Sequence, residues 1–112
     1  MDELVKKLSN GVHPIKFESR TEEIQEIKDR LDDGFVFATF TKTRGGTELG
    51  INVEKDLTDI SKADFEKGKG HLHISGTCEL NYHKIRCVAD VDFTSREGTG
   101  YLIPLDETDK VH

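Results

Sequence analysis

LHISGTCEL (residues 72–80) and IRCVADVDF (residues 85–93) decide the fold of this chain. Both stretches alternate apolar and polar residues, which is the pattern of a half-buried strand. When they are paired antiparallel about Tyr82-His83, their apolar residues share one face, and a slip of one residue would turn one set away from it. The predicted hairpin therefore has a definite register, with the pairs Leu80–Ile85, Cys78–Cys87, Gly76–Ala89, Ile74–Val91 and Leu72–Phe93.

Cys78 and Cys87 lie side by side on the apolar face in this register. A redox pair or half of a metal site would use such neighbours. A disulfide between directly paired strand residues is strained, however, and the chain has no Cys-x-x-Cys motif. We therefore expect two buried, reduced thiols that pack as small apolar side chains.

The overall composition fits one soluble domain over residues 1–112, with a polar tail at 106–112. No apolar run approaches the roughly 18 residues of a transmembrane helix, and the N-terminus lacks a signal region. We expect a cytoplasmic protein with no membrane association. The net charge of −6 disfavours a nucleic-acid partner, because phosphate backbones repel an acidic chain.

A helix is predicted over residues 19–34. Ser19-Arg20-Thr21-Glu22 fits a capping box at its start, and Gly34 suits a left-handed cap at its end. Between them, Ile24, Ile27 and Leu31 form a narrow apolar stripe. This helix is expected to cover one face of the sheet.

A second hairpin is predicted over residues 34–54. Gly45-Gly46 supplies a two-residue turn, which places Phe40 opposite Ile51 and Ala38 opposite Val53. Shorter elements are a helix at 1–8, a strand at 15–17 and a last strand at 100–105. We predict the α+β class: a largely antiparallel sheet of five to six strands, with the main helix (19–34) and the short N-terminal helix packed on one face.

DGFVFATF (residues 33–40) resembles the strand signature of the RNA recognition motif. The resemblance implies that Phe35 and Phe37 stack on nucleobases and that Phe40 points into the core. It implies a single-stranded nucleic-acid binder, which we keep as a further alternative.

Phe35 and Phe37, with Val88 from the other hairpin, fall on faces opposite to the predicted core. If both hairpins belong to one sheet, the three side chains lie on the face that the helix leaves uncovered, and grouped exposed apolar residues mark contact surfaces. Our first hypothesis is a non-enzymatic interaction or accessory module, with Phe35, Phe37 and Val88 as its surface. Its partner would be another protein or a second copy in a homodimer.

His71 and His73 lie on one face of a predicted strand, with Asp92 opposite His73 and Asp90 two residues along. Two imidazoles and a carboxylate can hold zinc or iron, and the same groups can transfer protons. The same residues also fit a solvated sheet face, so we expect no cofactor and no bound metal. The alternative is a small metal-dependent or acid/base enzyme that uses His71, His73, Asp90 and Asp92.

Overall fold

The computed structural model describes residues 3–18 and 23–105. It begins with a short helix and a strand, continues with the longer helix, and is built from strands thereafter. The elements are α1 (Glu3–Leu8), β1 (His13–Phe17), α2 (Ile24–Asp33), β2 (Phe35–Phe40), β3 (Thr47–Val53), the 3₁₀ turn η1 (Lys55–Leu57), β4 (Ala63–Asp64), β5 (Lys69–Leu80), β6 (His83–Asp92) and β7 (Glu97–Pro104).

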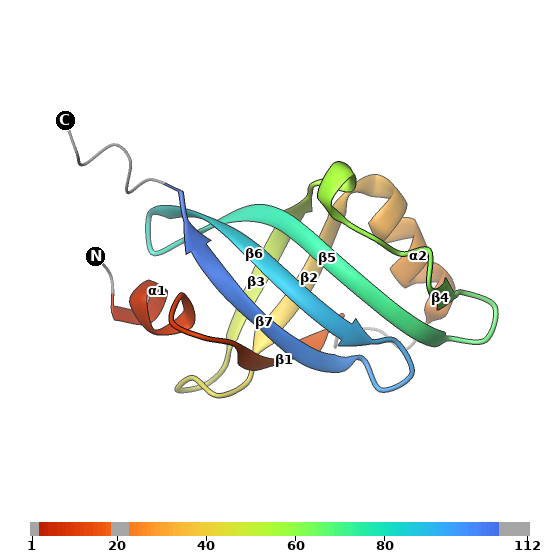
Figure 1. Ribbon diagram of the computed structural model, residues 1–112, viewed down its shortest axis with the longest axis horizontal. Helices are drawn as coiled ribbons and strands as arrows, with labels where there is room; N and C mark the ends of the chain where they lie inside the picture. Colours follow the sequence, from red (N-terminus) through yellow and green to blue (C-terminus); the bar gives the residue numbers. More distant parts are fainter. Residues whose placement is uncertain (1–2, 19–22, 106–112) are drawn as a thin grey trace.

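Six of the strands form a closed antiparallel β-barrel. Their order is β3-β2-β1-β7-β6-β5, and β3 pairs again with β5 to close the ring, while β4 is an extra strand beside β5. The two helices lie at opposite ends of the barrel (Figure 1). The predicted α+β arrangement, an open sheet with a main helix on one face, is therefore wrong. The antiparallel pairing is correct, but the sheet curls on itself and its inner face is the core.

Closure depends on a contact between the two hairpins. Asn52 pairs with Thr77 and Val53 with Gly76. A Cβ atom at Gly76 would lie 2.4 Å from the backbone oxygen of Asn52, so only glycine lets β3 approach β5 this closely. The alternation of each hairpin was visible in the sequence, but this pairing between hairpins is not encoded by either one.

The β5–β6 hairpin forms with its apolar faces matched, but its predicted register is wrong by two residues. Leu80 pairs with His83, Cys78 with Ile85 and Gly76 with Cys87. The cause is the turn, which consists of Asn81 and Tyr82 alone, with φ of 50° and 70°. Two residues with positive φ are typical of a type I′ turn, which fits the twist of a hairpin.

The β2–β3 hairpin shows the same kind of error, by four residues. Phe40 pairs with Thr47 and Ala38 with Leu49. Gly45 and Gly46 have positive φ as predicted, but they end a six-residue loop over residues 41–46 instead of forming the whole turn. Since both shifts are even, every side chain keeps its predicted face.

Both helices contribute side chains to the core. α1 buries Val5 and Leu8, and α2 buries Ile27 and Leu31. The predicted capping box at Ser19–Glu22 lies outside the described residues, and α2 begins at Ile24. No described helix has the length and apolarity needed to cross a membrane. The strands complete the core with Ile15, Phe17, Val36, Ala38, Phe40, Leu49, Ile51, Leu72, Ile74, Ile85, Cys87, Ala89, Val91 and Leu102, and Phe93 joins it just after β6.

Candidate functional site

Phe35 and Phe37 project from the outer wall of β2, because Val36, which lies between them in the sequence, points into the barrel. We call this pair the aromatic ledge. Its rings meet edge to face with centroids 5.2 Å apart, and Phe35 remains 41% exposed. Val88 lies on β6, three strands away from β2 in either direction around the ring. The structure therefore brings Phe35 and Phe37 together but places Val88 on the opposite wall.

The two rings of the ledge are held by their neighbours within the chain. Phe35 lies over Gly50 of β3, where a Cβ atom would come within 2.6 Å of the ring. The guanidinium carbon of Arg30 lies 5.8 Å from the centroid of the Phe37 ring, within the range of a cation–π contact. An aromatic ring that covers a strand glycine is a common stabilising device in sheets. The contacts of both rings within the chain thus give the ledge a structural role. The exposed area of Phe35 is the part that these contacts leave uncovered.

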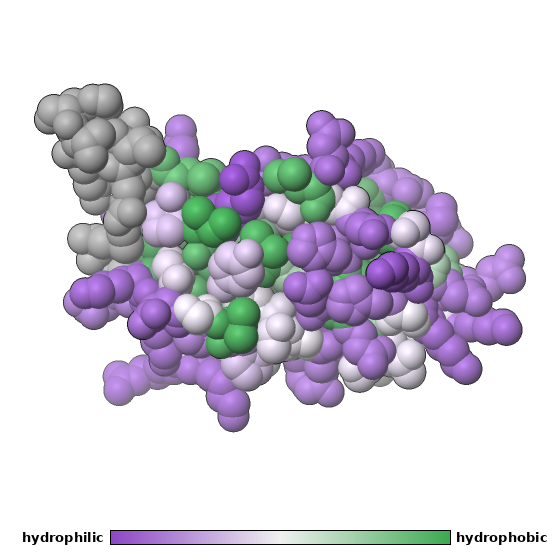
Figure 2. Space-filling model, viewed as in Figure 1, coloured by the Kyte–Doolittle hydropathy of each residue, from purple (hydrophilic) through white to green (hydrophobic). Residues whose placement is uncertain are grey.

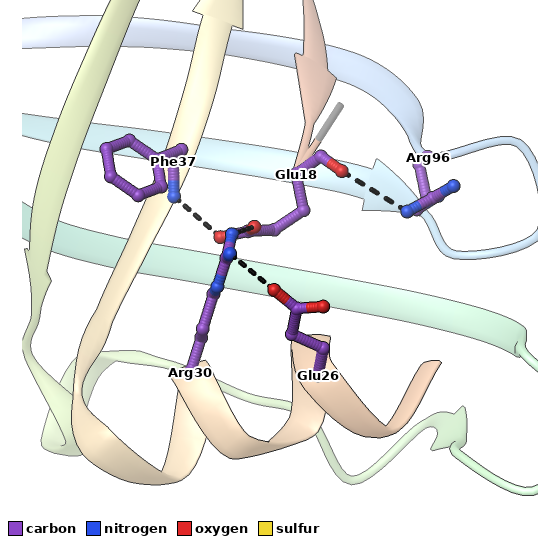
Figure 3. A network of polar contacts seen from close by, with 5 residues as sticks. All are labelled: Glu18, Glu26, Arg30, Phe37 and Arg96. Carbon is purple, nitrogen blue, oxygen red and sulfur yellow. Dashed lines mark hydrogen bonds and ion pairs between the residues drawn. The ribbon is translucent and has the colours of Figure 1, made fainter. Parts of the chain in front are cut away.

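Arg30 is fixed by a buried carboxylate, that of Glu18. Glu18 is fully buried, forms an ion pair with Arg30, and accepts a hydrogen bond of 2.8 Å from the backbone N–H of Phe37. Arg30 also donates to Glu26, at 2.7 Å. Figure 3 shows these contacts joining the end of β1, α2 and β2. The polar network ties the helix to the strand that carries the ledge.

The backbone at Glu18 explains why the sequence did not reveal this network. Alternation along β1 would turn Glu18 outward, next to the inward-facing Phe17. Its φ of 51° instead puts it in the left-handed region, which is uncommon for glutamate, and its side chain ends inside. The one available signal was the spacing of Glu26 and Arg30, four residues apart on a helix.

A hollow of about 180 Å³ opens at the C-terminal end of α2. Leu31, Val53 and Ile60 give it apolar walls, and Lys55 borders it. The Cε atom of Lys55 also lies 4.0 Å from where a Cβ of Gly34 would be, one residue before Phe35. Lys55 thus lies between the hollow and the backbone that immediately precedes β2.

The opposite wall carries a second apolar group, on β6 and β7. Val88 pairs with Tyr101, and Ile103, which is 37% exposed, follows on the same outer face. Figure 2 shows hydrophobic side chains exposed over these strands among polar ones. Val88 thus belongs to a different surface from the one that the sequence pattern suggested.

His71 and His73 share one carboxylate on the outer wall of the barrel. In the observed register His73 pairs with Asp90 and His71 with Asp92. Asp90 accepts from His73 Nδ1 at 2.8 Å and from His71 Nε2 at 3.2 Å, whereas Asp92 accepts from the backbone N–H of Thr94. Partial burial acts to raise the pKa of Asp90, but the hydrogen bonds from both histidines outweigh it and leave the pKa below its ordinary value. Across residues 3–18 and 23–105, no three His, Cys, Asp or Glu side chains are arranged to hold a metal ion.

Cys78 and Cys87 are both free thiols on the inner side of the wall, Cys87 buried and Cys78 partly so. The two-residue shift makes them diagonal neighbours, which lie about 7–8 Å apart, with Cβ–Cβ distances only somewhat shorter. A disulfide needs about 3.5–4.5 Å. Burial raises the pKa of Cys78 to about 11, and burial with the nearby Cys78 raises that of Cys87 to about 12. Both thiols are thus protonated and poorly nucleophilic at neutral pH.

Comparisons with known proteins give no further guidance to this site. No protein-family model matches the chain, and a search of curated proteins also finds no match. The barrel also differs from the four-stranded sheet of the RNA recognition motif, whose strand signature residues 33–40 resemble.

Proposed function

We propose that this protein is a non-enzymatic interaction module that binds a protein partner at the aromatic ledge. The observation that supports this most directly is Phe35, a large aromatic side chain that stays 41% exposed next to a ring held in place. Aromatic residues and arginine are enriched where protein interfaces gain most of their energy. Burying the rest of Phe35 would contribute favourable free energy with little further loss of side-chain freedom.

The hollow beside Lys55 fits the same function. At about 180 Å³ it is smaller than the roughly 300–1,000 Å³ of sites for drug-sized ligands. Its walls of Leu31, Val53 and Ile60 suit one apolar side chain of a partner.

Charge favours a protein over a nucleic acid at this ledge. Stacking yields about 1–3 kcal/mol per base, but a strand of phosphates must first approach a chain of net charge −6. Near the ledge, the positive charge of Arg30 is already paired with Glu18 and Glu26. An apolar protein contact meets no such repulsion.

Two matched variants test the proposal. Phe35→Ser removes the exposed ring, and Ile103→Ser removes an apolar side chain of similar exposure on the opposite wall. A partner isolated from the native cell, or the second copy in sedimentation experiments, should bind the Phe35→Ser protein roughly tenfold or more weakly. The Ile103→Ser protein should bind normally. Equal losses in both variants, or tight single-strand DNA binding at physiological salt that Phe35→Ser abolishes, would contradict the proposal.

A further inference from the structure

The seam at which the barrel closes is short, and the strands separate beyond it. β3 pairs with β5 at two positions only, Asn52–Thr77 and Val53–Gly76. β5 then continues as far as Leu80, and in Figure 1 it runs toward its turn with β6 while β3 runs toward the loop that precedes it. A barrel that is closed along its whole length has no free strand edge. The described part of this one keeps two, which border what we call the seam gap, between residues 47–51 of β3 and 78–80 of β5.

The main-chain groups of Gly50 point into the seam gap. On β3, the N–H of Val53 donates to the carbonyl of Gly34, just before β2, at 2.9 Å. N–H and C=O groups alternate in direction along an antiparallel strand, so those of Gly50 point away from β2, as those of Asn52 do. Asn52 has Thr77 of β5 as its partner, but no described residue pairs with Gly50 on this side.

Glu79 presents the same kind of groups from the other edge. The carbonyl of Ser75 accepts a hydrogen bond of 2.8 Å from the N–H of Glu54, which follows β3, so alternate residues of β5 turn toward β3. Glu79 is one of these, and in this register Gly50 would be its partner in the next bonded pair of the ladder. The strands diverge before this pair forms. Among the described residues, each edge is therefore left with an N–H and a C=O that have no main-chain partner.

A hollow of about 360 Å³, which we call the seam pocket, opens at the seam gap. Its apolar lining consists of Cys78, Ile85 and Leu105, and Glu79 borders it. Ile85 is fully buried, and Cys78 is partly buried on the same inner face. Successive side chains of a strand point to opposite faces, so a strand added beside Glu79 would send one side chain into the seam pocket and the next outward.

The aromatic ledge lies on the outer side of the same gap. The ring of Phe35 covers Gly50, where a Cβ atom would come within 2.6 Å of it, and Phe35 remains 41% exposed. On a strand added beside Gly50, an outward side chain would therefore lie next to the exposed part of this ring. The strand edges, the seam pocket and the ledge thus offer contacts to the backbone and to both faces of one extended segment.

We propose that the partner binds as an extended segment that adds a strand to the barrel in the seam gap. This inference rests on the interaction function proposed for the aromatic ledge and specifies the form of the partner. The main chain of the segment would pair with Gly50 and Glu79, and its alternate side chains would fill the seam pocket and cover Phe35. The net charge of −6 opposes the addition of a second copy and favours an uncharged or basic segment of another protein.

The test combines an NMR titration of the full chain with amide hydrogen exchange. The probe is a capped seven-residue peptide of alternating valine and threonine with a lysine at each end, since these residues favour an extended chain and the lysines make it basic. The amides of Gly50 and Glu79 should exchange rapidly in the free protein and become protected as the peptide saturates. The same peptide with every second amide N-methylated keeps its side chains but loses donors, and it should bind about tenfold more weakly.

Glu79→Pro removes one N–H from the seam gap, at an edge position where a strand tolerates proline. It should weaken peptide binding about fivefold. Glu79→Gln is the matched control, because it removes the same charge and keeps the N–H, and it should bind within about twofold of the original. If Phe35→Ser weakens binding and Glu79→Pro does not, strand addition is overturned and the ledge proposal stands. The reverse result would overturn the ledge and leave strand addition in place.

Equal binding of the methylated and unmethylated peptides would overturn the strand pairing, and so would equal losses in Glu79→Pro and Glu79→Gln. Slow exchange of the Gly50 and Glu79 amides in the free protein would also contradict the proposal. Protection at every concentration would mean that the chain itself fills the gap, and protection at high concentration alone would mean that a second copy does. The absence of saturable protection by the peptide would overturn the proposal altogether.

Discussion

Two carboxylate–guanidinium pairs join distant parts of this molecule, one inside it and one on its surface. Glu18 pairs with Arg30 where β1, α2 and β2 meet, and the Glu18 side chain is fully buried. Glu54 pairs with Arg86 on the outer wall, where both side chains are about 30% exposed. The outer pair is bidentate, with hydrogen bonds of 2.7 Å and 2.9 Å. The chemical groups are the same, but their burial and their contact geometry differ.

The comparison teaches that contact geometry alone does not determine how much an ion pair contributes to stability. A buried carboxylate has lost its water, so its partner must replace that hydration in full. An exposed carboxylate that loses its partner is simply hydrated again. We therefore expect that removing the arginine of the inner pair lowers the free energy of unfolding strongly. Removing the arginine of the outer pair should lower it only slightly. Three of the four predictions that follow test this contrast, and the one at Gly76 tests how the barrel closes.

Arg30→Met should have the largest effect on stability. It leaves the buried Glu18 carboxylate without its cation, and breaking a buried pair from one side costs about 3–5 kcal/mol. The free energy of unfolding, measured by urea denaturation at pH 7, should fall by that amount.

Adding Glu18→Gln to Arg30→Met gives the control, because a neutral amide needs no counter-charge. The double variant should recover part of the lost stability. If the double variant is as unstable as the sum of both single changes, the network is not coupled as described.

Gly76→Ala should rank second. The added Cβ would meet the backbone oxygen of Asn52, so β3 must move away from β5 at the point where the barrel closes. Overpacking of this kind costs about 1–3 kcal/mol, measured by thermal and urea unfolding. Thr77→Ala, at the next residue of β5, whose side chain is only partly buried, controls for side-chain change without the clash. A Gly76→Ala protein of unchanged stability would mean that closure does not require this close contact.

Mild acid should weaken the fold through exposed carboxylates. Hydrogen bonds from Arg86 lower the pKa of Glu54 from its ordinary 4.5, and those from His73 and His71 lower that of Asp90 from 3.8 despite its partial burial. Because both pKa values are lower in the folded chain, their stabilisation is complete above the ordinary values and is lost as pH falls through the folded ones. The free energy of unfolding should therefore decline below about pH 5. The decline should be shallower in Glu54→Gln, and an identical pH profile would contradict the assignment.

Arg86→Gln should have the smallest effect at neutral pH. The released Glu54 remains accessible to water, and exposed pairs contribute little to stability. Its unfolding midpoint should stay close to that of the original protein and well above that of Arg30→Met. A loss as large as the one in Arg30→Met would erase the contrast between the two pairs.

The sequence predicted local features well because they depend on alternation. The inward faces of all four strands in the two hairpins are correct, since an apolar period of two specifies a face. The predicted registers were wrong because the backbone conformation sets the length of a turn. Tyrosine rarely has a positive φ, so Asn81-Tyr82 was not recognisable in the sequence as a two-residue turn.

Features that depend on contacts between distant segments could not be predicted. The β3–β5 pairing joins two hairpins, and without it the sheet appears open and Val88 seems to share a face with Phe35. Glu18 turns inward only because its backbone leaves the strand conformation. That Phe35 and Phe37 share a face opposite to the core was predicted, because they are two residues apart on one strand.

The ring of strands also sets the order in which the protein can fold. β1 pairs on one side with β2, which follows it closely, but on the other with β7, so that His13 meets Gly100. A growing chain therefore exposes one edge of β1 until nearly all of the described residues have been synthesised. Such non-local pairing slows folding, since the entropy of a long loop is lost before the contact forms. We expect the two hairpins to form early and the β1–β7 pairing to be the late, slow step.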